Sequence, residues 1–98
     1  MINIEPQHLE IILTILKKYN YTFYLFGSRA TDKAQKFSDL DLFYKNETPQ
    51  KIISSMQEDF YASNLPYTVD IINYNTCKPY FQEIIDKNNI LLYKKSTT

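Results

Sequence analysis

The stretch Leu25-Phe26-Gly27-Ser28-Arg29-Ala30 holds the only glycine and the only arginine of this 98-residue chain. The six residues before the glycine, 21–26, are dense in aromatic and β-favouring side chains, which predicts a buried strand that stops at a turn. Glycine suits such a turn because it takes positive φ angles without steric penalty. Residues 28–35 are then expected to form a short helix followed by a loop.

Helical and strand patterns alternate along the rest of the chain. Apolar residues at helical spacing follow Pro6 as far as about Lys18, and further helix starts are expected at Thr48-Pro49 and Pro79. Short β-favouring runs predict strands at 40–44, 67–72 and 90–93. This order predicts an α/β (α+β) protein with one sheet flanked by about four helices, forming a single domain over 1–93. Residues 94–98 are expected to be a frayed tail.

Composition excludes several classes of protein. Eleven basic and eleven acidic residues cancel, which argues against direct nucleic-acid binding by phosphate neutralisation. Cys77 is the only cysteine, so neither an internal disulfide nor a cysteine-ligated zinc site is expected. No apolar run approaches the length of about 18 residues that a membrane span needs. A cytoplasmic protein without membrane contact is therefore expected.

Three aspartates lie where strands should be apolar. Asp39 and Asp41 are two residues apart at the start of the second predicted strand, so their side chains leave the same face, roughly 7 Å apart along the strand. Asp70 interrupts the apolar residues of the third strand. A lone Asp-x-Asp pair is usually a solvated strand end, but three carboxylates on neighbouring strands would need cations. Oxygen ligands without histidine favour Mg²⁺, with Mn²⁺ as an alternative, over Zn²⁺.

Gly27 and Ser28 offer the groups that bind a polyphosphate. The glycine lets the backbone approach closely, the helix expected after it directs N–H groups outward, and the serine hydroxyl adds a donor. Arg29 has two interpretations of similar weight: it could contact a phosphate or an acidic residue of a partner, or it could be a solvated arginine at a helix start. A phosphate site beside carboxylates that hold Mg²⁺ is typical of phosphoryl or nucleotidyl transfer.

Three stretches, Leu25–Ala30, Phe37–Leu42 and Leu65–Ile71, together resemble the DNA polymerase beta-like nucleotidyltransferase superfamily. The Gly-Ser pair, ten intervening residues, Asp-x-Asp and a later strand aspartate are most similar to its minimal nucleotidyltransferase (MNT) proteins. The resemblance implies a mixed sheet flanked by helices, ATP as substrate, two Mg²⁺ ions, and transfer of AMP to a hydroxyl.

The resemblance also implies roles for individual residues. Asp39 and Asp41 would ligate metal, Asp70 would ligate metal and help deprotonate the acceptor, and Gly27 and Ser28 would hold the β- and γ-phosphates. MNT proteins are often encoded beside HEPN ribonuclease toxins and act as their antitoxins, in characterised cases by adding AMP to a toxin tyrosine. The implied partner is such a toxin, in a hetero-oligomer that could also contain a homodimer.

Two alternatives to protein AMP transfer stay open at this point. The stretch 31–37 carries neither the second glycine nor the second arginine of many relatives, which would suit a nucleotide-binding antitoxin that neutralises its partner by docking alone. The chain could also be one subunit of an enzyme that modifies a small molecule. The short length leaves little chain beyond the sheet and helices to hold an acceptor, so each reading predicts a partner.

Overall fold

A computed structural model, which describes residues 2–97, contains one four-stranded sheet in the order β3-β2-β1-β4. The strands are β1 (Phe23–Phe26), β2 (Leu40–Tyr44), β3 (Val69–Asn73) and β4 (Asn89–Tyr93). β1 runs antiparallel to both β2 and β4, whereas β2 and β3 are parallel. The sheet is therefore mixed, as the resemblance implied.

Three α-helices accompany the sheet: α1 (Pro6–Tyr19), α2 (Gln50–Ala62) and α3 (Pro79–Lys87). Prolines begin α1 and α3, as predicted, and α2 begins one residue after Pro49. The structure has three α-helices instead of about four, because the short helix expected at the start of 28–35 is a 3₁₀ turn, Gly27–Ala30, and the expected loop follows it. No residue of 31–38 is buried, so this segment has no apolar stripe that could hold a longer helix against the sheet.

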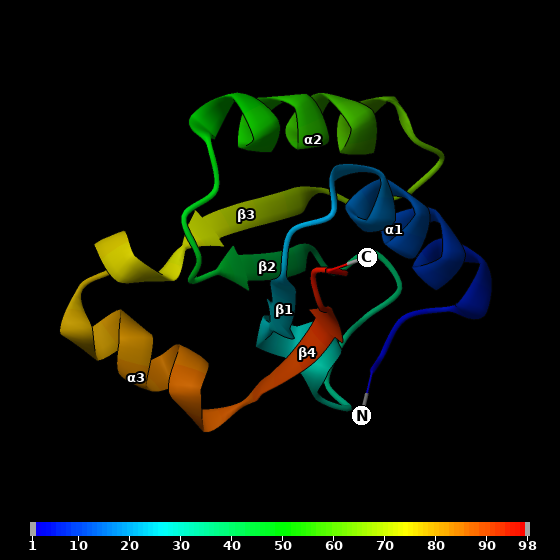
Figure 1. Cartoon of the computed structure of the whole chain (residues 1–98). Helices are drawn as coiled ribbons and strands as arrows, with labels where there is room; N and C mark the ends of the chain where they lie inside the picture. Colours follow the sequence, from blue (N-terminus) through cyan, green and yellow to red (C-terminus); the bar gives the residue numbers. More distant parts are fainter. Residues whose placement is uncertain (1, 98) are drawn as a thin grey trace.

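The two faces of the sheet are covered unequally. Figure 1 shows α1 and α2 together on one side of the sheet, while α3 lies on the other. The larger core fills the first side. Its fully buried members are Ile12, Leu16, Phe23, Leu25, Leu40, Leu42 and Met56.

A smaller aromatic cluster lies under α3 on the second face. Phe26, Phe43 and Ile85 are its buried members. The rings of Tyr24 and Phe43 stack with centroids 4.9 Å apart, and Phe26 meets Phe43 edge to face. This single nine-residue helix leaves the start of β2 and β3 uncovered on that face, and the polar residues of the site lie there.

The end of the chain differs from the frayed tail expected over 94–98. The Lys95 amide donates to the Thr22 hydroxyl at 2.9 Å, and the Ser96 amide donates to the Asn20 side-chain oxygen at 2.8 Å. These bonds hold the segment after β4 against the turn between α1 and β1. Thr98 lies outside the described residues. Among residues 2–97, no helix is long and apolar enough to cross a membrane.

Candidate active site

The strand register brings the predicted acidic residues into one row. Asp41 in β2 lies directly opposite Asp70 in parallel β3 and opposite Phe26 in antiparallel β1. Residues paired in this way share a face of the sheet, here the face that α3 covers in part. Asp39 comes two residues before Asp41 and is directed to the same side by the alternation of the chain. The sequence prediction that these three residues lie together is therefore consistent with the fold.

Asp41 differs from its two neighbours in burial. Asp39 and Asp70 are exposed, whereas Asp41 is partly buried between them. Burial, together with the negative charges of Asp70 and Asp39, raises the pKa of the Asp41 carboxyl from 3.8 to about 6. The Asp41 carboxyl therefore ionises less readily than an exposed aspartate does.

The carboxylates do not form a ready-made three-ligand group. Within residues 2–97, no three acidic, histidine or cysteine side chains are close enough to enclose a metal ion. The three carboxylates nevertheless supply what a hard divalent cation requires, because they combine oxygen ligands with unbalanced negative charge. The donor set thus fits Mg²⁺ or Mn²⁺, provided that a bound ion and nucleotide draw the carboxylates together.

Position 27 requires glycine for two reasons, its backbone conformation and its contact with Asp41. Its φ angle is +75°, a region that side-chain-bearing residues rarely adopt. A Cβ atom added at this position would overlap the carboxylate of Asp41. The glycine therefore allows the end of β1 to lie directly against the carboxylate of Asp41, the most buried of the three aspartates. The sequence suggested a different use for it, the close approach of a phosphate.

Ser28 follows in the 3₁₀ turn. Because this helix has only four residues, the strong dipole expected from a longer helix is absent. The Ser28 carbonyl accepts both the amide and the hydroxyl of Thr31, at 3.0 and 2.7 Å. Within residues 2–97 the Ser28 hydroxyl has no hydrogen-bond partner, so it is available to a ligand.

Arg29 is buried, which contradicts one of the interpretations that the sequence suggested. Its side chain is only 4% exposed, so it is not a solvated arginine. All three guanidinium nitrogens donate to backbone carbonyls, those of Asn3, Gln35, Lys36 and Ser38. Donors that are already used inside the protein are poorly placed to hold a phosphate. In this structure Arg29 is therefore a buried residue bound to backbone carbonyls, and a contact with phosphate stays a prediction.

Sequence reasoning missed two residues that surround Arg29. The Tyr67 ring lies over the guanidinium carbon at 3.8 Å from the ring centroid, and the Asn3 amide donates to the Arg29 carbonyl at 2.8 Å. Both are far from Arg29 in the chain, and no local pattern marks either one. Tyr67 was predicted only as the first residue of the third strand, which gave no reason to connect it with Arg29.

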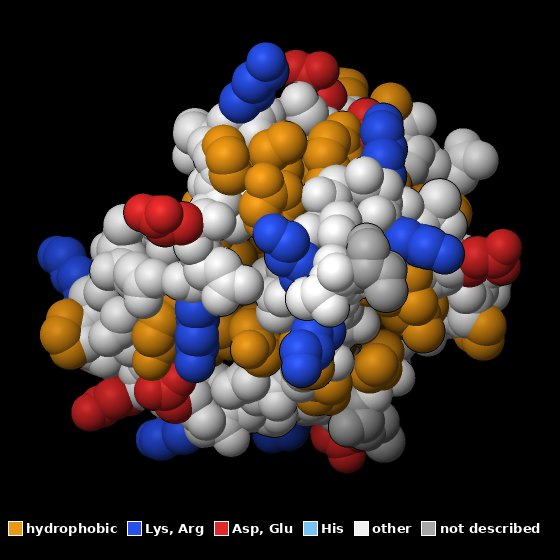
Figure 2. All heavy atoms as spheres, in the orientation of Figure 1, with side chains coloured by type: hydrophobic (Ala, Val, Ile, Leu, Met, Phe, Trp, Pro, Cys, Tyr) orange, Lys and Arg blue, Asp and Glu red, His pale blue; other side chains and the backbone are white. Residues whose placement is uncertain are grey.

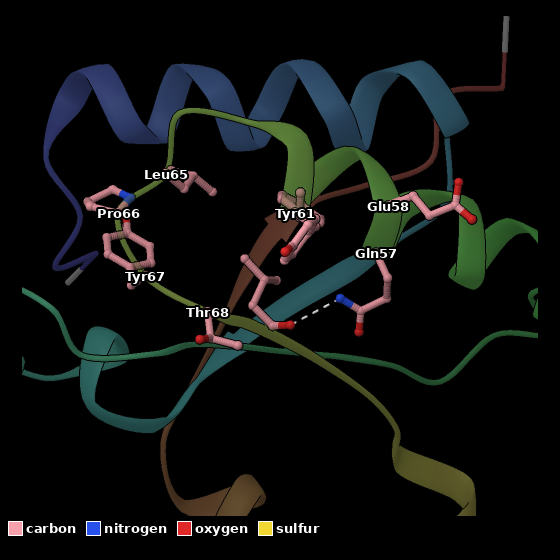
Figure 3. Close-up of a pocket in the computed structure, with 9 residues that line it drawn as sticks. Gln57, Glu58, Tyr61, Leu65, Pro66, Tyr67 and Thr68 are labelled. Atoms are coloured by element: carbon pink, nitrogen blue, oxygen red, sulfur yellow. Dashed lines mark hydrogen bonds between the residues drawn. The ribbon is translucent and has the colours of Figure 1, made fainter.

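A hollow in the surface lies away from the three aspartates. It measures about 710 Å³ and is formed by the end of α2 and the segment leading into β3, with Phe60, Tyr61, Leu65, Pro66 and Tyr67 among its lining residues. Figure 3 shows Gln57 reaching from α2 to a carbonyl of this segment, the Val69 oxygen at 3.1 Å. None of the three aspartates lines the hollow, so its volume does not mark the acidic site.

Charge is dispersed over the face drawn in Figure 2. Basic and acidic side chains are interspersed there with apolar patches, one of which lies over α2. This face carries no continuous basic stripe of the kind that tracks a nucleic-acid backbone. The distribution agrees with the net charge of zero.

Comparison with known proteins gives one family and several relatives. The family model "Polymerase beta, Nucleotidyltransferase" matches residues 10–98. A Haemophilus influenzae protein described as the probable protein adenylyltransferase MntA is 37% identical over 101 residues, which cover 99% of this chain and 89% of that protein.

Solved structures resemble the fold at lower identity. A crystal structure of a toxin–antitoxin with AMP-PNP matches with a TM-score of 0.64 and 18% identity, over 90% of this chain and 74% of that chain. A tri-AMPylated Shewanella oneidensis HEPN toxin in complex with an MNT antitoxin matches with a TM-score of 0.58 and 15% identity, over 91% and 71% of the two chains. At these identities the likeness establishes the shared fold.

Proposed function

We propose that this chain, which belongs to the polymerase beta nucleotidyltransferase family, transfers AMP from ATP to a hydroxyl group of a protein partner. Membership of the family makes the chain a nucleotidyltransferase. The specific proposal is an antitoxin whose acceptor is a tyrosine of a HEPN ribonuclease toxin. The relative at 37% identity carries the name of a protein adenylyltransferase, and this supports a protein acceptor.

The observation that carries the proposal is the acidic row beside Gly27. Asp39, Asp41 and Asp70 would hold Mg²⁺, or Mn²⁺ in its place, and the ion would neutralise charge on the triphosphate and on the attacking oxygen. The raised pKa of Asp41 supports this role, because burial and the charges of Asp70 and Asp39 destabilise the ionised carboxylate and a bound cation would stabilise it. The Cβ-free surface of Gly27 keeps the approach to Asp41 open.

The remaining groups support the transfer step itself. The Ser28 hydroxyl and the backbone after Gly27 would bind the β- and γ-phosphates. The acceptor oxygen attacks the α-phosphorus, the bond from that phosphorus to the β-phosphate oxygen breaks, and pyrophosphate leaves. Asp70 is exposed at the edge of the row and would accept the proton from the acceptor hydroxyl.

The test is AMP transfer from ATP labelled at the α-phosphate to a HEPN toxin that is co-expressed and purified with this chain. Asp39→Ala/Asp41→Ala should lower the rate roughly a thousandfold, because it removes the carboxylates that hold charge in the transition state. Asp32→Ala/Glu47→Ala is the matched control, since it removes two exposed carboxylates outside the row. Unchanged labelling by the first variant would refute the proposal.

One observation favours a second candidate, an antitoxin that neutralises its partner by docking. The three carboxylates do not form a preassembled three-ligand group within the described residues. The same pair of variants separates the two functions. Full neutralisation by Asp39→Ala/Asp41→Ala would favour docking, while loss of neutralisation with an intact complex would favour catalysis.

A further inference from the structure

The buried guanidinium of Arg29 joins segments that border the candidate site. Its Nε atom donates to the Ser38 carbonyl at 3.0 Å, and Ser38 is the residue immediately before Asp39. One terminal nitrogen donates to the Lys36 carbonyl at 3.2 Å and more weakly to the Gln35 carbonyl at 3.4 Å. Arg29 itself belongs to the same 3₁₀ turn as Gly27 and Ser28. A single side chain thus connects the phosphate-binding turn with the backbone that leads into the acidic strand.

Few other interactions fix the position of the loop over 31–38, whose carbonyls bind Arg29. Every residue of 31–38 is at least partly exposed, and Phe37, its only large apolar residue, is 62% exposed. Within the loop, the Gln35 amide donates to the Ser38 hydroxyl at 2.8 Å and closes a local turn. Because the loop places no side chain of its own in the core, its position depends on the side chain supplied from outside.

The surroundings hold Arg29 itself in place. The second terminal nitrogen donates to the Asn3 carbonyl at 3.1 Å, and the Asn3 side chain donates in return to the Thr31 carbonyl at 3.0 Å. The Tyr67 ring covers the guanidinium plane. Within residues 2–97 the guanidinium forms no ion pair, so carbonyl dipoles and the ring stabilise its charge.

We propose that Arg29 is a positioning residue, which sets the location of Asp39 and Asp41 relative to Gly27 and Ser28. The inference deepens the proposed function and rests on it for the activity measurement. A small displacement of reacting groups lowers rates strongly, on the order of a hundredfold for about 1 Å. Fixing the loop is therefore a contribution to catalysis made without contact with the substrate.

The choice of arginine follows from the geometry of its donors. A planar guanidinium reaches several carbonyls at once, whereas a lysine ammonium is a compact charge on a flexible stem and cannot span the same set. Arg29→Lys keeps the charge and part of the packing but releases most of the carbonyls. Arg29→Met removes the charge as well. Lys33→Met is the matched control, because it removes an exposed cation from the same loop.

The experiment measures four properties of each variant in complex with its partner. They are thermal unfolding, hydrogen exchange of the amides of 35–41, affinity for Mn²⁺ in the presence of AMP-PNP, and kcat and KM for AMP transfer. Arg29→Lys should fold, exchange faster over 35–41, and bind Mn²⁺ on the order of tenfold more weakly. Its kcat should fall about 10- to 100-fold while the KM for ATP changes little. Lys33→Met should match the wild type.

Three results would overturn the inference. A folded Arg29→Lys with wild-type exchange and Mn²⁺ affinity would show that the loop does not depend on the arginine. A rise in the KM for ATP with unchanged exchange would make Arg29 a direct phosphate ligand. A lower melting temperature with unchanged kcat in the folded protein would leave only a structural role.

The measurements also separate this inference from the proposed function. If the wild-type complex transfers no AMP, the proposed function fails, while exchange and Mn²⁺ affinity still test the placement of the loop. Arg29→Met is the more severe substitution because it leaves several carbonyls without donors. If it does not fold, Arg29→Lys and Tyr67→Leu, which keeps every carbonyl bond but removes the ring, provide the same comparison.

Discussion

The two faces of β2 serve different purposes although they alternate along the same five residues. Leu40 and Leu42 are completely buried beneath α1 and α2, whereas Asp41, between them, points to the opposite face and lies opposite Asp70. Every second residue of a strand shares a face, so a single strand contributes to the core and to the candidate site at once. The comparison teaches that the site is positioned by the same residues that stabilise the fold.

The largest expected effect on stability comes from the core face. Leu42→Ala should lower the free energy of unfolding by about 3 kcal/mol, because it leaves a cavity in a fully buried position. Urea denaturation monitored by circular dichroism measures the loss. Leu91→Ala is the control, since Leu91 is 48% exposed on β4 and should lose less than about 1 kcal/mol. Equal losses would contradict the assignment of the core to the α1 and α2 side.

The sequence identified the acidic row because its signal is local. Asp39 and Asp41 share a face by their spacing alone, and the placement of Asp70 required only that the second and third strands be neighbours, as they are. Start positions of α1 and α3 were predicted for the same reason, since proline at a first helical turn is a local preference.

The errors came from contacts between distant segments. Arg29 is not the solvated residue that one interpretation expected, and its partners are backbone carbonyls that no residue pattern predicts. The tail was expected to be free, yet Ser96 is held by Asn20, 76 positions away. The short helix expected at the start of 28–35 is only a 3₁₀ turn, because the polar segment after it is bound by an external side chain and needs no regular structure of its own.

A substitution of intermediate effect probes the point where the end of β1 meets the start of β2. Gly27→Ala should lower the free energy of unfolding by about 2 kcal/mol, because alanine disfavours a φ of +75° and its Cβ overlaps Asp41. In an Asp41→Gly background the loss should fall to about 1 kcal/mol, the backbone part alone. Urea denaturation of the four proteins of this cycle measures the difference. Identical losses in both backgrounds would refute the contact with Asp41.

The smallest effect is a gain of stability on the site face. Asp41 has a pKa of about 6 in the folded chain against 3.8 without these surroundings, so the folded state keeps a proton that the unfolded state releases as the pH rises from about 4 to about 6. Stability should therefore fall with rising pH over this window and stay lower at pH 7.

Asp41→Asn removes this charge and should make the chain about 1 kcal/mol more stable at pH 7, after allowance for solvent screening of a partly exposed group. The advantage should shrink below pH 4, where wild-type Asp41 is neutral in both states. Thermal unfolding without divalent cations, recorded from pH 3.5 to 7.5, measures it. Asp39→Asn should give a much smaller change, because Asp39 is exposed. A loss of stability in Asp41→Asn at pH 7 would mean that the carboxylate stabilises the fold, and the two faces of β2 would then not differ in the way described.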